Sequence, residues 1–582
     1  MKASAPWSTR DRLLLLCLWA IFAALVQRFW FLTDDSYISF RYSRNLALGN
    51  GLRFNLGEHL PVEGYSNLLW VLACAGIERL GLNIEFWPLI ISGLCGGGLL
   101  TLVYRTMRMR LELDTTPAFL ASLSVAAFPP IAVWSTGGLA TMPFALLLFI
   151  TFERSILRRK AIHGPSTCVA IVGLCLIRVE GAYWTVAILL LTAVSRRAAG
   201  ERLGYGYLLA SCALVATVVA QVTWRNAYYG LLVANTVSAK GGMSMARLER
   251  GLDYITGWTL TMLVPLLLIP AAWIALRQKR KAILLPLVAM AMAGFAFSIL
   301  VSGDYMTFGR FMVPFWAFNV LLLGVMWQAL HERGHRRTCI SAALACVVIG
   351  LLPGWDVHLV PKSVRERFHF RHNTPRHSSE FEQWRNQERY AQVWAARGRV
   401  LKRWLKPGSS IVLDTGIGAT AYYSDLFIHD RGGLVTRETA ERPALSDRLY
   451  SPGHDMKKPM KFFLKYRPDT IIAEWPTRPA LANQLERVRA KLERLGPDIE
   501  ADYLVDFRPV PAWDAPSPHL FVVYARRIEE GESPEQVAAL VDQRAADVLD
   551  GITPYRDVVM DGYPLPPWYR PEMSEPTRSR PR

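Results

Sequence analysis

The chain has 582 residues, is 52% hydrophobic and 20% charged, and carries a formal net charge of +18. Its eight cysteines all lie within or beside apolar runs, which argues against a disulfide framework and against a cysteine zinc site. No zinc-finger spacing or RNA-binding signature accompanies the basic charge, so we expect no nucleic-acid partner.

Apolar runs of about 20 residues dominate the chain before residue 360, and such runs are typical of membrane-spanning helices. The first follows a basic segment and lacks a clear cleavage site, so we interpret it as a retained signal anchor. The stretch 67–80 is short for a crossing, and we expect a juxtamembrane or re-entrant helix there. We place about eleven spans, at residues 12–32, 86–104, 117–135, 137–153, 166–178, 181–195, 204–224, 257–277, 282–301, 311–330 and 338–354.

Basic clusters between the apolar runs predict the orientation in the bilayer. With the N-terminus inside, all of them fall on the cytoplasmic side, as the positive-inside rule requires. We therefore predict a multi-pass protein of the bacterial inner (cytoplasmic) membrane whose C-terminal part is periplasmic. The clusters are residues 105–110, 153–160, 195–202, 277–281 and 331–337.

Polar residues gather in the loops predicted to face outward, which are residues 33–67, 134–138, 177–181, 224–242 and 301–311. The adjacent Asp34 and Asp35 are the foremost candidates, because paired carboxylates serve as an acid and base, share a metal ion or hold an arginine. The alternative interpretation is that an aspartate caps the N-terminus of a helix that begins at Ser36. The following "FRYSRN" has the spacing of an amphipathic helix that lies in the membrane interface.

The other outward loops supply further binding candidates. Cations, aromatic rings and amides suit a phosphate and its sugar, whereas carboxylates, hydroxyls and amides suit a hydroxyl-rich ligand. The alternatives are a mutual ion pair of Arg178 and Glu180, an interfacial aromatic belt, and a capping Asp304 with a snorkelling Arg310. The expected donor-binding residues are Arg41, Arg225, Asn235, Lys240, Asp304 and Arg310, and the expected acceptor-binding or sugar-binding residues are Glu63, Tyr65, Asn67, Arg178, Glu180 and Tyr228.

The predicted location restricts the substrates. Nucleotide sugars and ATP are cytoplasmic, so an enzyme that faces outward needs a donor delivered through the membrane, and a polyprenyl phosphate that carries a sugar meets this need. One aspartate would then act as general base or stabilise positive charge at the sugar carbon. We expect no other cofactor, although a divalent cation shared by the carboxylates stays an open alternative.

An ordered series of motifs carries a resemblance over roughly residues 30–475. It comprises "TDDSYISFRYSRNLALGNGLRFNLGEHLPVEGYSNLLW", "WSTGGLATMPF", "IRVEG", "YYGLLVANTVSAK", "GDYMTFGRFMVPF" and "SIVLDTGIGATAYYSDLFIHDRGGL". The series resembles the GT-C superfamily of polytopic glycosyltransferases, and within it the arabinofuranosyltransferase-like subgroup of the mycobacterial terminal and pseudomonad pilin types. The resemblance implies a helical bundle, an acidic motif in the first periplasmic loop, a periplasmic C-terminal domain and a decaprenyl-phosphoryl sugar donor.

Carried over to this chain, the resemblance implies that Asp34 and Asp35 form the acidic motif, with Asp34 acting and Asp35 in support. It also implies donor or acceptor contacts by Arg41, Glu63, Tyr65, Asn235, Lys240, Asp304 and Arg310. The chain departs from its relatives at Ala140, where they commonly have a glutamate. If that glutamate binds the sugar in the relatives, the donor specificity of this chain differs from theirs. Arabinofuranose, which the resemblance implies, is our first choice of sugar.

The C-terminal part has the composition of a soluble α/β domain. Strands are expected at 409–416, 469–475 and 520–527, and helices at 380–406, 455–466 and 480–495, which suggests an α/β sandwich. "DTGIGATAYYSD" is glycine-rich after a strand but lacks the Lys-Ser/Thr of a phosphate loop, so a role in holding the acceptor is preferred.

We thus predict a polytopic α-helical membrane protein with a GT-C-like bundle and a C-terminal α/β periplasmic domain. Residues 1–360 form the transmembrane catalytic domain with its first periplasmic loop at 33–85, residues 361–570 form the periplasmic domain, and 571–582 form a disordered tail. The predicted activity is the transfer of a sugar, arabinofuranose first, from a polyprenyl-phosphate donor to an envelope glycan or pilin-type protein acceptor. The alternatives are a transporter or flippase of lipid-linked glycan, and an envelope scaffold that binds glycan.

Overall fold

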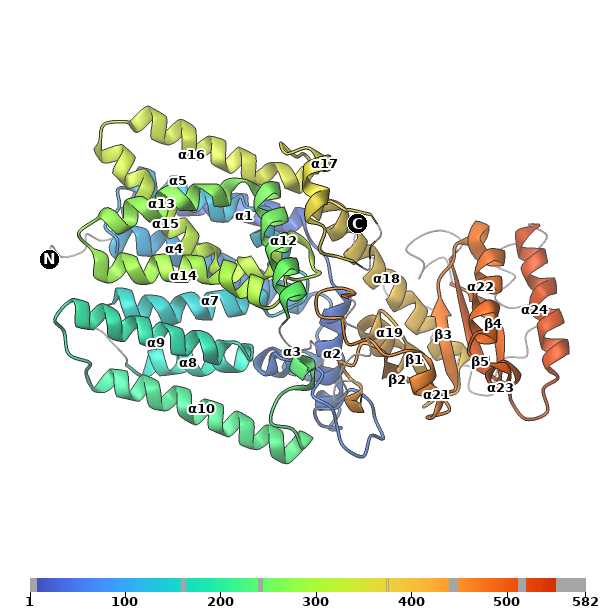
Figure 1. Cartoon of the computed structure of the whole chain (residues 1–582). Coiled ribbons are helices and arrows are strands. Elements are labelled where there is room, and N and C mark those ends of the chain that lie inside the picture. The colour runs from blue at the N-terminus through green and yellow to red at the C-terminus, as the bar shows by residue number, and fades with distance from the viewer. Residues whose placement is uncertain are drawn as a thin grey trace. The chain divides into compact units, whose positions relative to one another are not determined.

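The computed structural model of the chain describes residues 8–158, 164–238, 244–372, 374, 376–438, 449–510 and 520–550 (Figure 1). The chain divides into two compact units, which we name the helical unit and the sheet unit. The helical unit comprises Met1–Thr33, Tyr65–Asn386 and Leu445–Asp455, and the sheet unit comprises Asp34–Gly64, Gln387–Ala444 and Met456–Arg582. This division differs from a single cut at residue 360, because part of the first loop belongs with the C-terminal segment. The predicted tail at 571–582 lies outside the described residues.

Each predicted span coincides with helix in the helical unit, since long apolar runs satisfy their own backbone hydrogen bonds in that form. The short stretch 67–80 also forms a helix, as expected. The elements are α1 (Thr9–Arg28), α3 (Leu68–Arg79), α4 (Trp87–Met109), α5 (Thr115–Ala126), α6 (Pro129–Trp134), α7 (Thr141–Phe152), η1 (Glu153–Leu157), α8 (Pro165–Ile177), α9 (Gly181–Ala198), α10 (Tyr205–Tyr229), α11 (Asn235–Ser238), α12 (Met245–Met262), η2 (Val264–Leu267), α13 (Leu268–Arg277), α14 (Lys281–Leu300), η3 (Thr307–Met312), α15 (Val313–Glu332), α16 (Arg336–Leu351), η4 (Leu352–Trp355), α17 (Lys362–Arg365) and η5 (Glu366–Phe368).

Among the described residues, five helical stretches are long and apolar enough to cross a membrane, and a sixth is counted if the bent pair α12 and α13 forms one span. The number of about eleven crossings stays a prediction. The five stretches are Trp87–Met109, Tyr205–Tyr229, Lys281–Leu300, Thr307–Glu332 and Arg336–Trp355.

Two predicted spans are not straight helices. The stretch 117–135 is interrupted at Phe128, because Pro129 and Pro130 cannot continue a helix and instead begin α6. The stretch 257–277 falls across α12 and α13, which meet at an angle of 95°. Leu263 between them has a positive φ of 56°, so the backbone turns there and the helix cannot run through.

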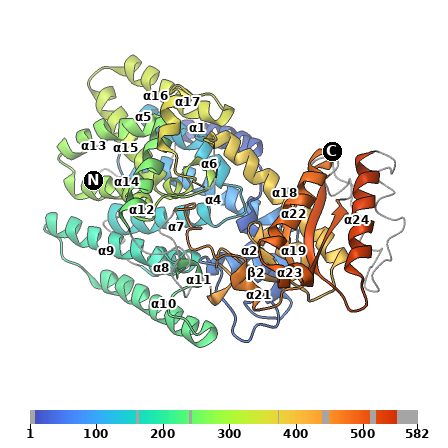
Figure 2. The same ribbon diagram turned by 45° about the vertical axis from the view of Figure 1, so that its right-hand side comes forward.

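Helix α15 forms the centre of the helical unit, and it packs against α5, α7, α13, α14 and α16 (Figures 1 and 2). Its residues from Val313 to Trp327 are all buried, as expected for a helix that is apolar on every side. The Trp316 ring stacks on Phe128 with centroids 4.2 Å apart. This rigid centre fixes the ends of α15, and the loop that precedes it carries two of the predicted site residues.

The sheet unit is built around a five-stranded sheet of order β2-β1-β3-β5-β4. Strand β1 is parallel to β2 and β3, whereas β5 is antiparallel to β3 and β4. Helix α18 begins in the helical unit and continues into this one. The elements are α2 (Asp34–Ala47), α18 (Glu380–Trp404), β1 (Ser410–Leu413), α19 (Ile417–Ser424), β2 (Phe427–Asp430), α21 (Lys461–Leu464), β3 (Thr470–Glu474), η6 (Arg478–Ala480), α22 (Leu481–Glu493), α23 (Pro497–Asp502), β4 (Tyr503–Pro509), β5 (Phe521–Arg527) and α24 (Pro534–Leu549).

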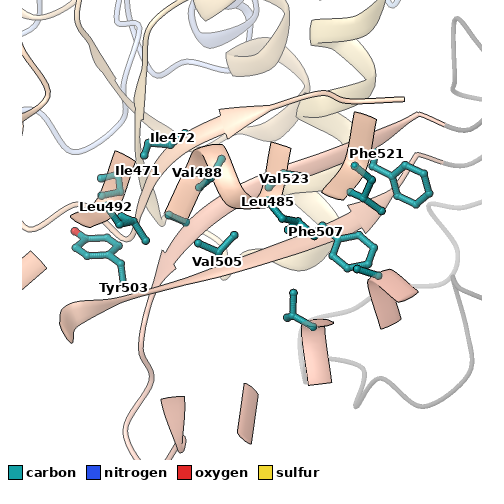
Figure 3. Close-up of a cluster of buried hydrophobic side chains, with 14 of the residues drawn as sticks. Ile471, Ile472, Leu485, Val488, Leu492, Tyr503, Val505, Phe507, Phe521 and Val523 are labelled. Carbon is teal, nitrogen blue, oxygen red and sulfur yellow. The ribbon is translucent and has the colours of Figure 1, made fainter. Parts of the chain in front are cut away.

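The core of the sheet unit joins helix α22 to one face of the sheet. Leu481, Leu485, Val488 and Leu492 recur at helical spacing and pack on alternate residues of β4 and β5 (Figure 3). Helix α24 adds Val541, Ala545 and Val548 to the same cluster. The sheet is therefore held firmly on the side of β4 and β5, and the ends of β1 and β3 keep a fixed position.

The predicted strands at 409–416, 469–475 and 520–527 are confirmed as β1, β3 and β5, and the helices at 380–406 and 480–495 as α18 and α22. The helix expected at 455–466 is wrong for most of its length, since only Lys461–Leu464 is α-helical. The interfacial interpretation of "FRYSRN" is also corrected. A helix on a membrane surface leaves one face exposed, whereas α2 is buried at every residue from Ser36 to Ser43 and packs on α19.

Candidate functional site

In the helical unit, Arg178 and Glu180 lie in the break between α8 and α9. Arg178 leaves the helix in an extended conformation, and Gly181 then opens α9 so close to the preceding helix that a Cβ there would lie 1.8 Å from the carbonyl oxygen of Leu174. The Arg178 Nε donates a 2.6 Å hydrogen bond to the Glu180 carboxylate. The mutual ion pair that the sequence offered as an alternative is present.

Asp304 and Arg310 occupy the irregular loop before α15. This loop contains four residues with positive φ, namely Ser302, Gly303, Phe308 and Gly309. The reversal brings the Arg310 guanidinium onto both oxygens of Asp304, at 2.7 and 3.0 Å. Such a two-point contact fixes the plane of the guanidinium as well as its position.

The two ion pairs converge, because Arg178, Glu180 and Arg310 line one small pocket of about 10 Å³ together with Thr141 and Phe144. That volume holds about one water molecule. The Thr141 hydroxyl is buried and has no hydrogen-bond partner among the described residues. Segments that are far apart in the sequence thus bring two arginines and an unsatisfied hydroxyl to one point.

The remaining predicted residues of this unit lie in two neighbouring segments. The Tyr65 hydroxyl lies 3.0 Å from that of Tyr229, and the Ser66 carbonyl accepts a hydrogen bond from the Val179 backbone. The loop at Tyr65–Asn67 is thereby tied to the break that carries Arg178, and Asn67 occupies the N-cap position of α3.

Near the end of α10, Arg225 is buried and contacts the Leu232 carbonyl at 3.4 Å, while Tyr228 stacks on Trp224. Asn235 is buried at the start of α11. Lys240 lies outside the described residues.

The sequence did not point to Arg250 or Asp455, which form a third arginine–carboxylate pair in the helical unit. The Arg250 guanidinium donates to both Asp455 oxygens at 2.7 and 3.0 Å and to the Ser302 hydroxyl at 2.8 Å. Burial alone would raise the pKa of Asp455, but the hydrogen bonds and charge of Arg250 hold it below its ordinary value. The spacing of these residues carries no pattern, so only the fold reveals them.

Arg371 and Glu380, which the sequence also left unassigned, hold the same loop from another direction. The Glu380 carboxylate accepts hydrogen bonds from the Thr307 hydroxyl and the Phe308 backbone, and Arg371 donates to the Tyr305 carbonyl at 2.8 Å. The conformation that presents Asp304 and Arg310 is therefore fixed at several points.

In the sheet unit, Asp34 caps helix α19. Its carboxylate accepts hydrogen bonds from the backbone N–H of Gly418 at 3.1 Å and of Ala419 at 2.7 Å, where a helix N-terminus favours negative charge. A Cβ at position 418 would lie 2.0 Å from the Asp34 carbonyl oxygen, so glycine is required. Desolvation outweighs these hydrogen bonds, and with help from the Asp35 charge it raises the pKa of Asp34 to about 7.

This arrangement also answers the question of a phosphate loop in "DTGIGATAYYSD". The loop follows β1 and leads into a helix N-terminus, as a phosphate-binding turn does. The Asp34 carboxylate occupies the backbone N–H groups that a phosphate would need. The neighbouring Asp35 is partly buried on the same first turn of α2.

Arg41 and Glu63, the other predicted residues of the sheet unit, are both buried. The Arg41 guanidinium donates to the carbonyls of Phe54, Ala421 and Leu426, and the first and last of these distances are 2.6 and 2.7 Å. These contacts join α2 to α19 and to the approach to β2. They favour a structural role for Arg41 over the expected donor contact.

The described residues contain no group of three or more histidine, cysteine, aspartate or glutamate side chains arranged to hold a metal ion. The divalent cation stays a prediction.

A bundle of apolar helices joined to a sheet unit defines a multi-pass membrane protein with the GT-C fold. The fold is similar to that of ArnT from Cupriavidus metallidurans. The structure of that protein bound to undecaprenyl phosphate has a TM-score of 0.51 and 13% identity, covering 88% of this chain and 97% of the other. Its apo structure has a TM-score of 0.50 and 14% identity over the same shares.

A family model described as "Domain of unknown function (DUF8728)" matches residues 382–527, which run from α18 to β5. No curated protein matches the chain.

Proposed function

We propose that this protein is a membrane glycosyltransferase that moves a sugar, with arabinofuranose as the first choice, from a polyprenyl-phosphate donor to an envelope glycan or protein acceptor. The reaction takes place on the periplasmic face of the bacterial inner membrane. The observation that carries the proposal is the convergence of Arg178 and Arg310 on one pocket, in a fold shared with a protein solved with undecaprenyl phosphate.

The paired arginines support a phosphate-linked donor. A guanidinium fork matches phosphate oxygens, and two forks at one point suit a phosphate better than one. Each arginine is paired with a carboxylate in this structure, so donor binding exchanges Glu180 and Asp304 for phosphate oxygens. The Thr141 hydroxyl, adjacent to Ala140, offers a hydrogen bond to the sugar where relatives have a glutamate.

We assign the general base to Asp35 and a positioning role to Asp34, which reverses the order implied by the resemblance. Both Asp34 oxygens accept backbone hydrogen bonds, so this carboxylate is committed to holding α19 against α2. Asp35 follows it on the same turn and is therefore placed by it. In the reaction, Asp35 takes the proton of the acceptor hydroxyl as that oxygen attacks the sugar carbon and the lipid phosphate leaves.

The test measures sugar transfer in proteoliposomes from a synthetic polyprenyl-phosphate arabinofuranose. We expect Asp35→Asn to lower kcat about 10²-fold to 10⁴-fold, as loss of a general base does. Asp34→Asn should retain more activity and show a changed melting temperature. Full activity in both variants would overturn the catalytic assignment, and movement of labelled lipid across the bilayer without sugar transfer would favour the transporter instead.

A second arm tests the donor site. The first variant is Arg178→Gln, and the second combines Asp304→Asn with Arg310→Gln. Each should raise the donor KM at least about tenfold, because each loses roughly one charge-assisted hydrogen bond to the phosphate. The double variant avoids a buried aspartate without a partner. Arg277→Gln is the matched control, because Arg277 stacks on Trp273 away from the pocket. An equal effect in all three proteins would refute the assignment of the donor site.

A further inference from the structure

A cavity of about 360 Å³ opens in the sheet unit beside the carboxyl ends of β1 and β3. From β1 the chain passes to β2 on one side, and β3 then pairs with β1 on the other. The strand order therefore reverses between β1 and β3, and crevices at such reversals are where open α/β sheets bind ligands. The volume also lies within the range of about 300–1,000 Å³ that is usual for small-molecule sites. We call it the strand-end crevice.

Charged residues line the strand-end crevice in pairs. Asp414 directly follows β1 and forms ion pairs with Arg431, at 3.3 Å, and with Lys457. Glu474 is the last residue of β3, and its carboxylate accepts a 2.5 Å hydrogen bond from Lys491. Each carboxylate is paired with a cation, and Arg397 and Arg494 also line the crevice, so it presents hydrogen-bond donors beside acceptors with the cations in excess.

An aromatic side chain adjoins these pairs. Trp475 follows β3 and lines the crevice, and the Arg397 guanidinium lies 5.1 Å from the centre of its ring. Arg397 is held in place by the carbonyls of Thr415 at 2.8 Å and Ala473 at 3.2 Å, which belong to the ends of both strands. The same arginine interacts electrostatically with Asp34, so the crevice adjoins the acidic motif within one unit.

The backbone is strained at this point. Ile472 has a φ of 60° within β3, where the pairing with β5 shifts register between Ile471 and Ala473. A β-branched residue has a high conformational energy in the left-handed region. Backbone strain of this kind, and bulges, cluster at functional sites. The bulge sets the direction in which Glu474 and Trp475 leave the strand.

A larger cavity of about 760 Å³ lies at the opposite ends of these strands, where it is lined by Ser409 and Asp469. There Arg526 donates to both Glu532 oxygens at 2.6 and 2.7 Å, so paired charges do not distinguish the two cavities and the strand ends do. Ligands of open α/β sheets bind at carboxyl ends and not at amino ends. The smaller crevice is therefore the stronger candidate, and Trp404 of the larger cavity provides a matched control.

We propose that the strand-end crevice binds a saccharide residue of a neutral glycan and thereby holds the acceptor beside the acidic motif. Sugar hydroxyls both donate and accept hydrogen bonds, which matches neutralised pairs of carboxylates and cations. The apolar face of a sugar ring packs on an indole. Asp414 and Glu474 accept hydrogen bonds, which sugar hydroxyls donate and a fully ionised anion cannot. The assignment of the glycan as acceptor rests on the proposed function, whereas saccharide binding itself does not.

The test uses the full chain in nanodiscs and labelled hexasaccharides of arabinan, galactan and mannan, with inorganic phosphate and a sulfated hexasaccharide as anionic probes. We expect at least one neutral hexasaccharide to bind, and Trp475→Ala and Glu474→Gln to weaken its binding at least tenfold. Glu474→Gln keeps the shape of the side chain, so it separates lost contacts from misfolding. Trp404→Ala should leave binding unchanged.

Transfer assays with the same variants distinguish the two proposals. Glu474→Gln should raise the KM for a long glycan acceptor and leave kcat and the donor KM unchanged. Glycan binding without any sugar transfer would refute the proposed function and leave the crevice assignment standing. Binding of only the anionic probes, binding of none, or equal binding by Glu474→Gln and the parent would each overturn the crevice assignment.

Discussion

The Ala419 backbone N–H donates a 2.7 Å hydrogen bond to the carboxylate of Asp34, although the two residues are 385 positions apart in the sequence. The contact ties the acidic motif of the first loop to a helix of the C-terminal segment within one unit. An ionisable group has thus become a helix cap. The pKa of Asp34, raised to about 7 chiefly by desolvation, makes this cap sensitive to pH.

The first prediction concerns the pH dependence of stability. The folded-state pKa of Asp34 lies above its ordinary value of 3.8, so the folded protein binds this proton more tightly than the unfolded chain does. Its contribution to stability is complete below about pH 4 and is lost as the pH rises towards 7. We expect the melting temperature of the parent, relative to that of Asp34→Asn, to fall over this window.

A matched comparison is available at Asp425, whose pKa is lowered because Arg44 and Lys402 outweigh its desolvation. The melting temperature of the parent, relative to that of Asp425→Asn, should be constant from pH 4 to pH 8 and fall only below about pH 4, where the stability that Asp425 provides is lost. Parallel melting curves for the parent and Asp34→Asn from pH 4 to pH 8 would contradict the assignment.

The second prediction separates structure from donor binding at Arg41. Lysine keeps the charge but cannot reach the carbonyls of Phe54, Ala421 and Leu426 together. Arg41→Lys should destabilise the protein by about 3 kcal/mol and leave the donor KM unchanged. Arg53→Lys is the control, because Arg53 is partly exposed and makes one carbonyl contact. A raised donor KM with an unchanged melting temperature would restore the donor role.

The third prediction concerns the unsatisfied hydroxyl of Thr141 in the small pocket. Thr141→Val removes a buried polar atom that has no partner among the described residues, so stability should rise or stay equal. If the hydroxyl binds the sugar, the donor KM should rise about tenfold, the value of roughly one hydrogen bond. Thr167→Val is the control, since its hydroxyl is equally buried and unsatisfied but lies outside the pocket. Lower stability and unchanged kinetics in Thr141→Val would refute the sugar contact.

The fourth prediction addresses Arg250 and Asp455, whose side chains are only 2% and 5% exposed. Asp455→Asn leaves a buried arginine without its charged partner and should cost about 3–5 kcal/mol. Because the pKa of Asp455 lies below its ordinary value, the pair stabilises the protein above about pH 4 and weakens as the pH falls further. Asp542→Asn, which breaks the exposed pair with Arg489, should have little effect on the melting temperature. Equal losses in both variants would contradict this prediction.

Local patterns in the sequence predict the helices well, because an apolar run of sufficient length specifies a buried helix without reference to the rest of the chain. The bend at Leu263 escapes such a pattern, since a positive φ at leucine arises from packing. Strand β2 is missed because His429 and Asp430 make up half of its four residues, whereas β1, equally short, is apolar after its first residue. Strand β4 is missed because Asp506 interrupts its apolar pattern.

The candidate site is predictable only in part. "IRVEG" and "GDYMTFGR" stand out as polar segments between apolar runs, so Arg178 and Arg310 are found. That they share a pocket depends on the packing of α7, α9 and α15, which no local signal specifies. Arg250 and Asp455 pair across some 200 residues. Arg397 lies in a helix with many other charged residues, so nothing in its sequence distinguishes this arginine from those on the surface.

The packing of α2 on α19 also fixes an order of events during synthesis. The first loop leaves the ribosome several hundred residues before the segment on which it packs. At about 5–20 residues per second, residues 34–64 wait roughly 20 to 70 seconds for α19, the helix on which α2 packs. During that interval buried side chains such as Phe40 and Tyr42 are exposed outside the bilayer. The apolar side chains of this loop are therefore the part of the sheet unit that a chaperone or the membrane surface can reach until the C-terminal segment arrives.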